Sequence, residues 1–189
     1  MKTLFTLLTL IALKVAAFAT VDLGTPSAYT PYERYMAPVK AVMGSLRQSK
    51  PSMDQVKQLM KEGRKFRYHM DDPYTPALPD VTSRIHEGDC KDKALWMVDH
   101  LDASARFVIG KTKRGTKISH AWVLWQNEGR WWILDCTLKN APIAADSVPD
   151  DQYVPLYSYG KGICYRHSET GSGVASVAGK QSVASVAQR

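Results

Sequence analysis

The chain lacks the features that mark several protein classes, and each shortage excludes one of them. It has 3 cysteines and neither a Cys-x-x-Cys nor a His-Glu-x-x-His pair, which excludes the common zinc-finger and metalloprotease signatures. Its 12 glycines and 10 prolines are too few for a collagen-like or low-complexity chain. Beyond the N-terminus it has no long hydrophobic run, so we expect a soluble body without stable membrane insertion.

The composition that is present predicts one packed domain. Of the 189 residues, 44% are hydrophobic and 10% aromatic, which is enough to build a core. The formal net charge is +7, but charged residues make up an ordinary 23% of the chain. This balance allows contact with anionic cell-wall polymers or an acidic peptide without indicating a nucleic-acid binder. We expect a monomer whose partner is a protein or peptide substrate, with cell-wall peptide as one option.

Residues 1–19 have the three parts of a secretory signal. Met1-Lys2 gives a basic start, an apolar stretch of about a dozen residues follows, and Ala17-Phe18-Ala19 is a small-x-small exit. The apolar stretch is too short to span a bilayer comfortably, although an uncleaved anchor is the alternative. We therefore expect export to the periplasm or the medium, with the folded domain over 20–167.

Helical patterns occupy the first part of that domain. Apolar residues recur at helical spacing over 32–47, and a second helix is predicted after Pro51, where Ser52 and Gln55 have the spacing of a capping box. Three prolines predict a loop over 69–80.

Strand patterns follow the helical ones. The period changes to two over 105–111, 117–126 and 130–137, where β-branched and aromatic residues are frequent, and 152–166 could add another strand. Helices first and strands afterwards indicate an α+β fold, with N-terminal helices packed on an antiparallel sheet. Residues 168–189 are small and repetitive, and they predict a disordered tail.

Cys90 lies where a nucleophile would be activated. Asp89 is a good N-cap, so Cys90 is expected at the first position of a helix. There, unpaired backbone N–H groups and the helix dipole favour a thiolate and could stabilise an oxyanion. Asp89 and Asp92 disfavour negative charge nearby, so a general base is still needed.

His120 is the predicted base. Strand alternation places His120 and Trp122 on one face of 117–126, and Asp135 on one face of the next strand. If the hairpin loop consists of Asn127 and Glu128, or of four residues, His120 lies directly opposite Asp135. A three-residue loop would offset them by one. The predicted geometry lets Asp135 orient the imidazole while His120 deprotonates Cys90.

These residues resemble a known family. Gly88-Asp89-Cys90-Lys91-Asp92-Lys93-Ala94, His120-Ala121-Trp122-Val123 and Trp132-Ile133-Leu134-Asp135-Cys136-Thr137 look like the three core motifs of the transglutaminase-like superfamily. The resemblance covers about a third of the chain and implies a papain-like α+β fold.

The resemblance also assigns roles to residues. It implies Cys90 as nucleophile, His120 as general base and acid, and Asp135 as the orienting carboxylate. It implies a further oxyanion donor upstream of Cys90, for which Tyr74, Ser83 and His86 are the candidates. Trp122, on the predicted face of His120, could line the cleft and exclude water.

The odd cysteine count allows one disulfide and one free thiol in an exported protein. A nucleophilic Cys90 must be the free one, which leaves Cys136 and Cys164 as the candidate pair. A bridge between Cys90 and Cys164 would instead block the site. Spacing alone does not decide between these pairings.

Two metal sites are alternatives to a cofactor-free enzyme. His86, Cys90, His120 and Asp135 are all possible zinc ligands. The acidic cluster of Asp71, Asp72 and Asp80 could bind calcium, as some members of the superfamily do, although it lacks the regular spacing of a calcium loop.

The sequence therefore predicts an exported thiol enzyme that acts on amide bonds through a thioester. Hydrolysis by a cysteine peptidase or amidase is preferred, because a small single domain has no evident module to recruit an amine acceptor. A cross-linking acyltransferase and a non-catalytic peptide- or glycan-binding module are the alternatives.

Overall fold

The computed structural model describes residues 21–46 and 49–168. The predicted signal, residues 1–19, lies outside the described residues, as does all of the predicted tail except Ser168. The helices are α1 (Ala37–Gly44), α2 (Met53–Lys65), α3 (Pro79–Ile85) and α4 (Cys90–Asp99), with short 3-10 turns η1 (Glu33–Tyr35) and η2 (Ala145–Ser147). The strands are β1 (Thr25–Ser27), β2 (Ala105–Lys113), β3 (His120–Asn127), β4 (Arg130–Leu134), β5 (Ile143–Ala144), β6 (Gln152–Gly160) and β7 (Ile163–Arg166).

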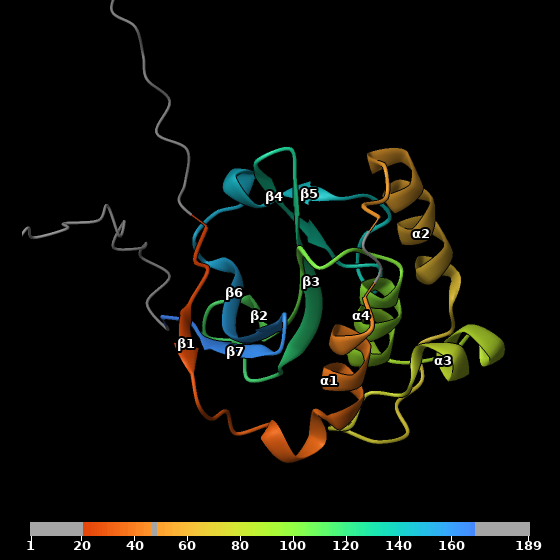
Figure 1. Ribbon diagram of the computed structural model, residues 1–189, viewed down its shortest axis with the longest axis horizontal. Helices are drawn as coiled ribbons and strands as arrows, with labels where there is room; N and C mark the ends of the chain where they lie inside the picture. The colour runs from red at the N-terminus through yellow and green to blue at the C-terminus, as the bar shows by residue number, and fades with distance from the viewer. Residues whose placement is uncertain (1–20, 47–48, 169–189) are drawn as a thin grey trace, which may run out of the picture.

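One antiparallel sheet organises the molecule. Its strand order is β1-β7-β6-β2-β3-β4-β5, and the four helices lie together on one side of it (Figure 1). The predicted α+β class is confirmed, including helices before the main strands. In the part of the chain that the structure describes, no helix is long and apolar enough to cross a membrane.

Alternation along β3 divides the core into two parts. Ala121, Val123 and Trp125 face the helices and pack with Leu95 of α4 in the larger cluster. Residues on the opposite face form a second cluster with strands β2, β4 and β6: Val108, Trp122, Leu124, Ile133 and Tyr153. The structure thus has the period-two pattern that the sequence predicted for this strand.

Local signals located most helix starts correctly. Ser52 accepts a hydrogen bond from the Gln55 backbone at 3.3 Å, and the Gln55 side chain accepts from the Ser52 backbone at 2.7 Å, which is the predicted capping box. Helix α3 begins at Pro79, inside the segment predicted as a loop, because proline is compatible with the first turn of a helix. The short edge strands β1 and β5 were not predicted from the sequence.

The β3–β4 hairpin has a different register from the predicted one. Its loop is Glu128-Gly129, with Asn127 paired to Arg130, and both loop residues have positive φ (51° and 74°). A two-residue loop with two positive φ angles matches strand twist, and glycine adopts it readily. The shift of one loop position moves the pairing by two residues, so His120 and Asp135 are not directly opposite.

Candidate active site

Cys90 is the first residue of α4, as predicted from its N-cap. The Asp89 side chain accepts a hydrogen bond from the Lys91 backbone at 3.0 Å, and the Asp92 side chain accepts one from the Asp89 backbone at 2.9 Å. This capping box satisfies two of the free N–H groups at the helix start. As the first residue of the helix, Cys90 lies at the positive end of the helix dipole. It is partly exposed, so it remains accessible.

The two carboxylates beside Cys90 are occupied by other partners. Lys91 Nζ lies 2.6 Å from Asp89 Oδ2 and 3.8 Å from Asp92 Oδ1. The Ala77 backbone donates to Asp92 Oδ1 at 2.8 Å, which ties the loop between α2 and α3 to the start of α4. Burial, together with the charge of Asp89, raises the pKa of Asp92. The repulsion that these acids would exert on a thiolate is therefore largely offset by Lys91.

His120 and Asp135 meet although they are not cross-strand partners. Strand β4 ends at Leu134, and Asp135 lies diagonally from His120, with its Oδ2 at 2.9 Å from His120 Nε2. Asp135 Oδ1 accepts from the backbones of Thr137 and Leu138 at 3.1 and 3.2 Å. A buried carboxylate with all these partners is fixed in orientation, and it fixes the imidazole in turn.

The other side of the imidazole is next to Cys90. Burial alone would lower the pKa of His120, but hydrogen bonding to Asp135 and to Cys90, and the negative charge of both, raise it to about 9. Since Nε2 is used by Asp135, Nδ1 is the nitrogen available to the sulfur. The structure therefore brings Cys90, His120 and Asp135 together, with His120 between the other two, which is the arrangement that the sequence predicts.

Tyr153 is a member of the site that sequence reasoning missed. Its hydroxyl donates to Asp135 Oδ2 at 2.9 Å, the same oxygen that His120 contacts. Burial and the Asp135 charge raise the pKa of Tyr153, so it stays a neutral donor. Its φ of 46° is unusual for a bulky residue, and such strain persists where the surroundings hold it. No local signal in β6 could have indicated a contact with a residue beyond β4.

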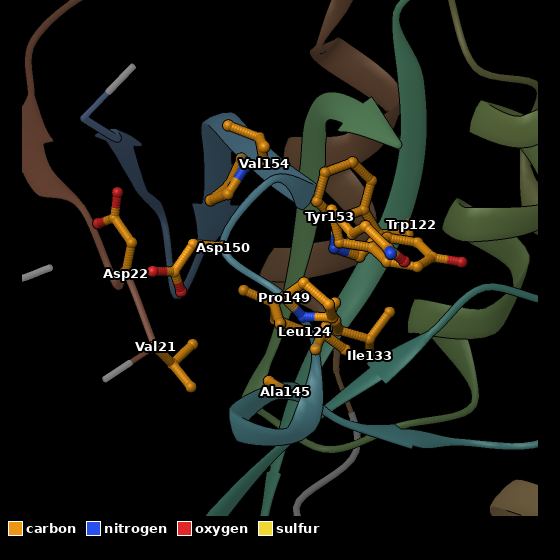
Figure 2. A pocket seen from close by; sticks show the side chains of 13 residues that line it. Val21, Asp22, Trp122, Leu124, Ile133, Ala145, Pro149, Asp150, Tyr153 and Val154 are labelled. Atoms are coloured by element: carbon orange, nitrogen blue, oxygen red, sulfur yellow. The ribbon is translucent and has the colours of Figure 1, made fainter. Parts of the chain in front are cut away.

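Trp122 supports the imidazole from outside the cleft. Its ring stacks on the His120 ring with centroids 6.2 Å apart. It meets the Tyr153 ring edge-on, with centroids 5.4 Å apart. Trp122 and Tyr153 form one end of a separate cavity on the sheet face away from the helices, with Val21 and Asp22 at the other end (Figure 2). The prediction that Trp122 lines the cleft is wrong, because it packs into the second core cluster.

If Cys90 is the nucleophile that the sequence predicts, replacing Tyr153 with phenylalanine is expected to lower kcat about tenfold and leave KM nearly unchanged. The loss removes one hydrogen bond that holds Asp135 and does not alter the cleft surface. Steady-state kinetics on any cleaved peptide measures the effect. Tyr165→Phe on β7 is the matched control, and equal kcat values for the two variants would show that the contact has no positioning role.

Apolar and aromatic side chains surround Cys90 and His120 in the cleft. Tyr74, one of three residues predicted to donate to an oxyanion, lines it, as does Tyr68, which was not predicted. Burial and the negative charges of Cys90, Asp89 and Asp92 raise the pKa of Tyr68. Ser83 and His86 do not line the cleft: both are exposed at the end of α3, and His86 packs on Phe66.

The candidate bridge between Cys136 and Cys164 is absent. All three cysteines are free thiols, and the strands that lead to Cys136 and carry Cys164, β4 and β7, are separated by β3, β2 and β6. Four strand spacings are about 19 Å, whereas a disulfide needs Cα atoms within about 7 Å. Burial raises the pKa of Cys136 to about 12. Cys164 Sγ donates to the Ser27 carbonyl at 2.6 Å.

Neither candidate metal site is assembled, since His86, the fourth zinc candidate, lies outside the cleft that contains Cys90 and His120. Among the described residues, no group of three or more His, Cys, Asp or Glu side chains could hold a metal ion. Asp71 pairs with His69 at 2.7 Å, and Asp72 Oδ1 accepts from the Tyr74 and Thr75 backbones at 2.6 and 2.8 Å. These residues do not fit calcium, and we assign it no part in the chemistry.

Comparison with known proteins adds a structural likeness. A scan against protein-family models finds no match, and a search of curated proteins finds no relative. Calcium-bound LapG of Legionella pneumophila is similar, with a TM-score of 0.49 and 19% identity over 75% of this chain and 82% of LapG. The EGTA-treated form of LapG has a TM-score of 0.46 and 19% identity, over 73% of this chain and 78% of LapG. A candidate cysteine protease of Cytophaga hutchinsonii has a TM-score of 0.38 and 20% identity, over 66% of this chain and 47% of that protein. The functional conclusion rests on the site geometry.

Proposed function

We propose that this chain is a transglutaminase-like cysteine peptidase or amidase with Cys90 as its nucleophile. The observation that carries the proposal is the partly exposed Cys90 at a helix N-terminus, beside an imidazole whose Nε2 is held by the buried Asp135 at 2.9 Å. Of the three cysteines, Cys136 is buried, and Cys164 lies on β7, which is separated from β3 by β6 and β2. Cys90 alone among them combines a neighbouring base, a positive helix end and a cleft shared with that base.

The geometry supports acyl transfer in two steps. His120 takes the Cys90 proton, the sulfur attacks the amide carbonyl, and the oxyanion is stabilised by the backbone N–H of Cys90, which the capping box does not use. His120 then returns the proton to the leaving amine, and a thioester remains on Cys90. Water attacks the thioester with His120 as base, which releases the acid and restores the thiol. Asp135 keeps the imidazole oriented throughout and stabilises its charged form.

Hydrolysis is the proposed outcome, and the protein acts after export. The chain supplies one domain with one cleft beside Cys90, and the proposed signal over residues 1–19 directs it to the periplasm or the medium. Adding a lysine-like amine during turnover distinguishes the acceptors: a hydrolase yields free acid as the main product, whereas a transferase yields the amide.

Selective alkylation tests the proposal without knowledge of the substrate. With iodoacetamide at pH 6, where a free thiol is mostly protonated, we expect Cys90 to react at least tenfold faster than Cys164 because His120 can take the proton from its sulfur. The advantage should disappear in His120→Ala. Peptide mass mapping measures both rates, with Cys164 as internal control. Slow labelling of Cys90 that does not depend on His120 would instead indicate a non-catalytic binding module.

A further inference from the structure

The cleft that contains Cys90 has an apolar interior. Its floor is formed by Met36, Phe107 and Ile109, which are 1%, 0% and 7% exposed. Its rim carries large apolar side chains in contact with water: Met70 and Ile118 are 53% and 83% exposed. Of the nine large hydrophobic residues exposed in the described chain, four line this one cleft. Exposed apolar side chains gathered in this way mark a binding surface.

The two sides of the rim are held in place before anything binds. On the side of Cys90, Tyr74 stacks on Tyr35 with ring centroids 4.8 Å apart, and the adjoining loop is anchored through Ala77 to Asp92. On the side of His120, Lys111 Nζ donates to the Lys117 carbonyl at 2.6 Å, next to Ile118. A surface that is already ordered loses little conformational entropy when it binds a ligand.

Charge in the cleft is balanced between its own residues. Apart from the Cys90–His120 pair, the charged side chains that line it are Asp89 and Lys91, which contact each other at 2.6 Å and are 2% and 8% exposed. A charged substrate group placed here would lose water without gaining a free partner of opposite charge. The cleft therefore favours neutral, apolar groups, although the whole chain carries a net charge of +7.

We propose that the site selects polypeptides with a bulky aliphatic or aromatic residue beside the scissile amide. This inference rests on the proposed function and specifies its substrate class. The selected side chain packs between Met70 and Tyr74 on one side and Ile118 on the other, while the scissile carbonyl lies at Cys90. The apolar surface hidden from water on both sides supplies the selectivity.

Matched alkylating reagents measure this preference at Cys90 without requiring turnover. Two neutral chloroacetamides of similar length are compared, one with an N-isobutyl group and one with an N-hydroxyethyl group. Each rate at Cys90 is divided by the rate of the same reagent with glutathione, which removes intrinsic reactivity. We expect the corrected isobutyl rate to be about tenfold higher. Equal corrected rates, or a faster hydroxyethyl reagent, would overturn the proposal.

A pair of isoleucine variants locates the preference. Ile118→Ser should reduce the isobutyl-to-hydroxyethyl ratio at Cys90 severalfold, because it removes one apolar wall. Ile163→Ser, at an exposed isoleucine on β7 outside the cleft, should leave the ratio unchanged. A ratio that is the same in wild type and Ile118→Ser would show that the rim does not bind the apolar group.

Digestion of a mixed-peptide library extends the test to substrates. We expect Leu, Phe and Met to be enriched at one position next to the cleaved bond, with both acidic and basic residues depleted there. Enrichment of charged or small residues instead would overturn the inference and leave the peptidase activity established. Absence of cleavage together with His120-independent labelling would refute the proposed function itself, while the reagent ratio still reports on the cleft.

Discussion

Cys90→Ser is expected to reduce peptide cleavage by a factor on the order of 10³ or more. Serine keeps the size and the helix-capping environment, but its hydroxyl is a far weaker nucleophile than a thiolate paired with His120. Because nucleophile and base act as a unit, losing either removes nearly all of their joint contribution. The measurement is kcat/KM on the peptide that wild type cleaves fastest in the library digest.

The other two thiols provide controls for this result. Cys164→Ser alters a partly exposed thiol on β7, outside the cleft of Cys90, and should leave kcat/KM within about twofold of wild type. Thermal unfolding of Cys90→Ser should stay close to wild type, because Cys90 is only partly buried at the margin of the core and serine has nearly the same size. If Cys90→Ser cleaves at the wild-type rate, or if Cys164→Ser is the inactive variant, Cys90 is not the nucleophile.

Asp135→Asn is expected to lower kcat by a factor on the order of 10³ to 10⁴ and to shift its pH dependence. The carboxylate fixes the imidazole tautomer, and an amide of the same size cannot do so with the same charge. Asp135 also raises the pKa of His120, which reaches about 9. Removing the negative charge lowers that pKa, so the imidazolium is lost at lower pH.

The sign of the pH shift follows from the role of the proton. His120 must carry a proton to protonate the leaving amine, so wild-type kcat should fall as the pH rises through about 9. In Asp135→Asn the same decline should begin at lower pH. Asp146→Asn, which changes a surface partner of Arg130, is the control and should retain the wild-type profile. An unshifted decline in Asp135→Asn would mean that Asp135 does not tune His120.

Several features of the site could be predicted because they depend on residues close together in the chain. Asp89 is followed at once by an apolar helical pattern, so the N-cap, the helix start and the position of Cys90 follow from local hydrogen bonding. Alternation along 117–126 similarly placed His120 and Trp122 on one face of the strand. The α+β class followed from the change of period after α4.

Other features could not be predicted because they depend on how distant segments pack. A shift of one residue in the β3–β4 loop changed the partner of every residue in the hairpin, yet the diagonal contact preserved the His120–Asp135 bond. Tyr153 reaches Asp135 only because β6 pairs with β2, and the expected Cys136–Cys164 bridge is excluded by the strand order. The separation of Trp122 from the cleft likewise appears only when both sheet faces are packed.

The amino-acid sequence by itself determined which side chains are the candidates for the proposed chemistry, since capping, turn and alternation patterns act over a few residues and can be recognised without the fold. The tertiary structure decided which of those side chains touch, which thiols stay apart and what lines the cleft. These outcomes depend on strand order and on packing between separate segments, such as Tyr153 and Asp135, which are 18 residues apart. Such contacts are selected by the free energy of the whole core, which no short stretch of sequence contains.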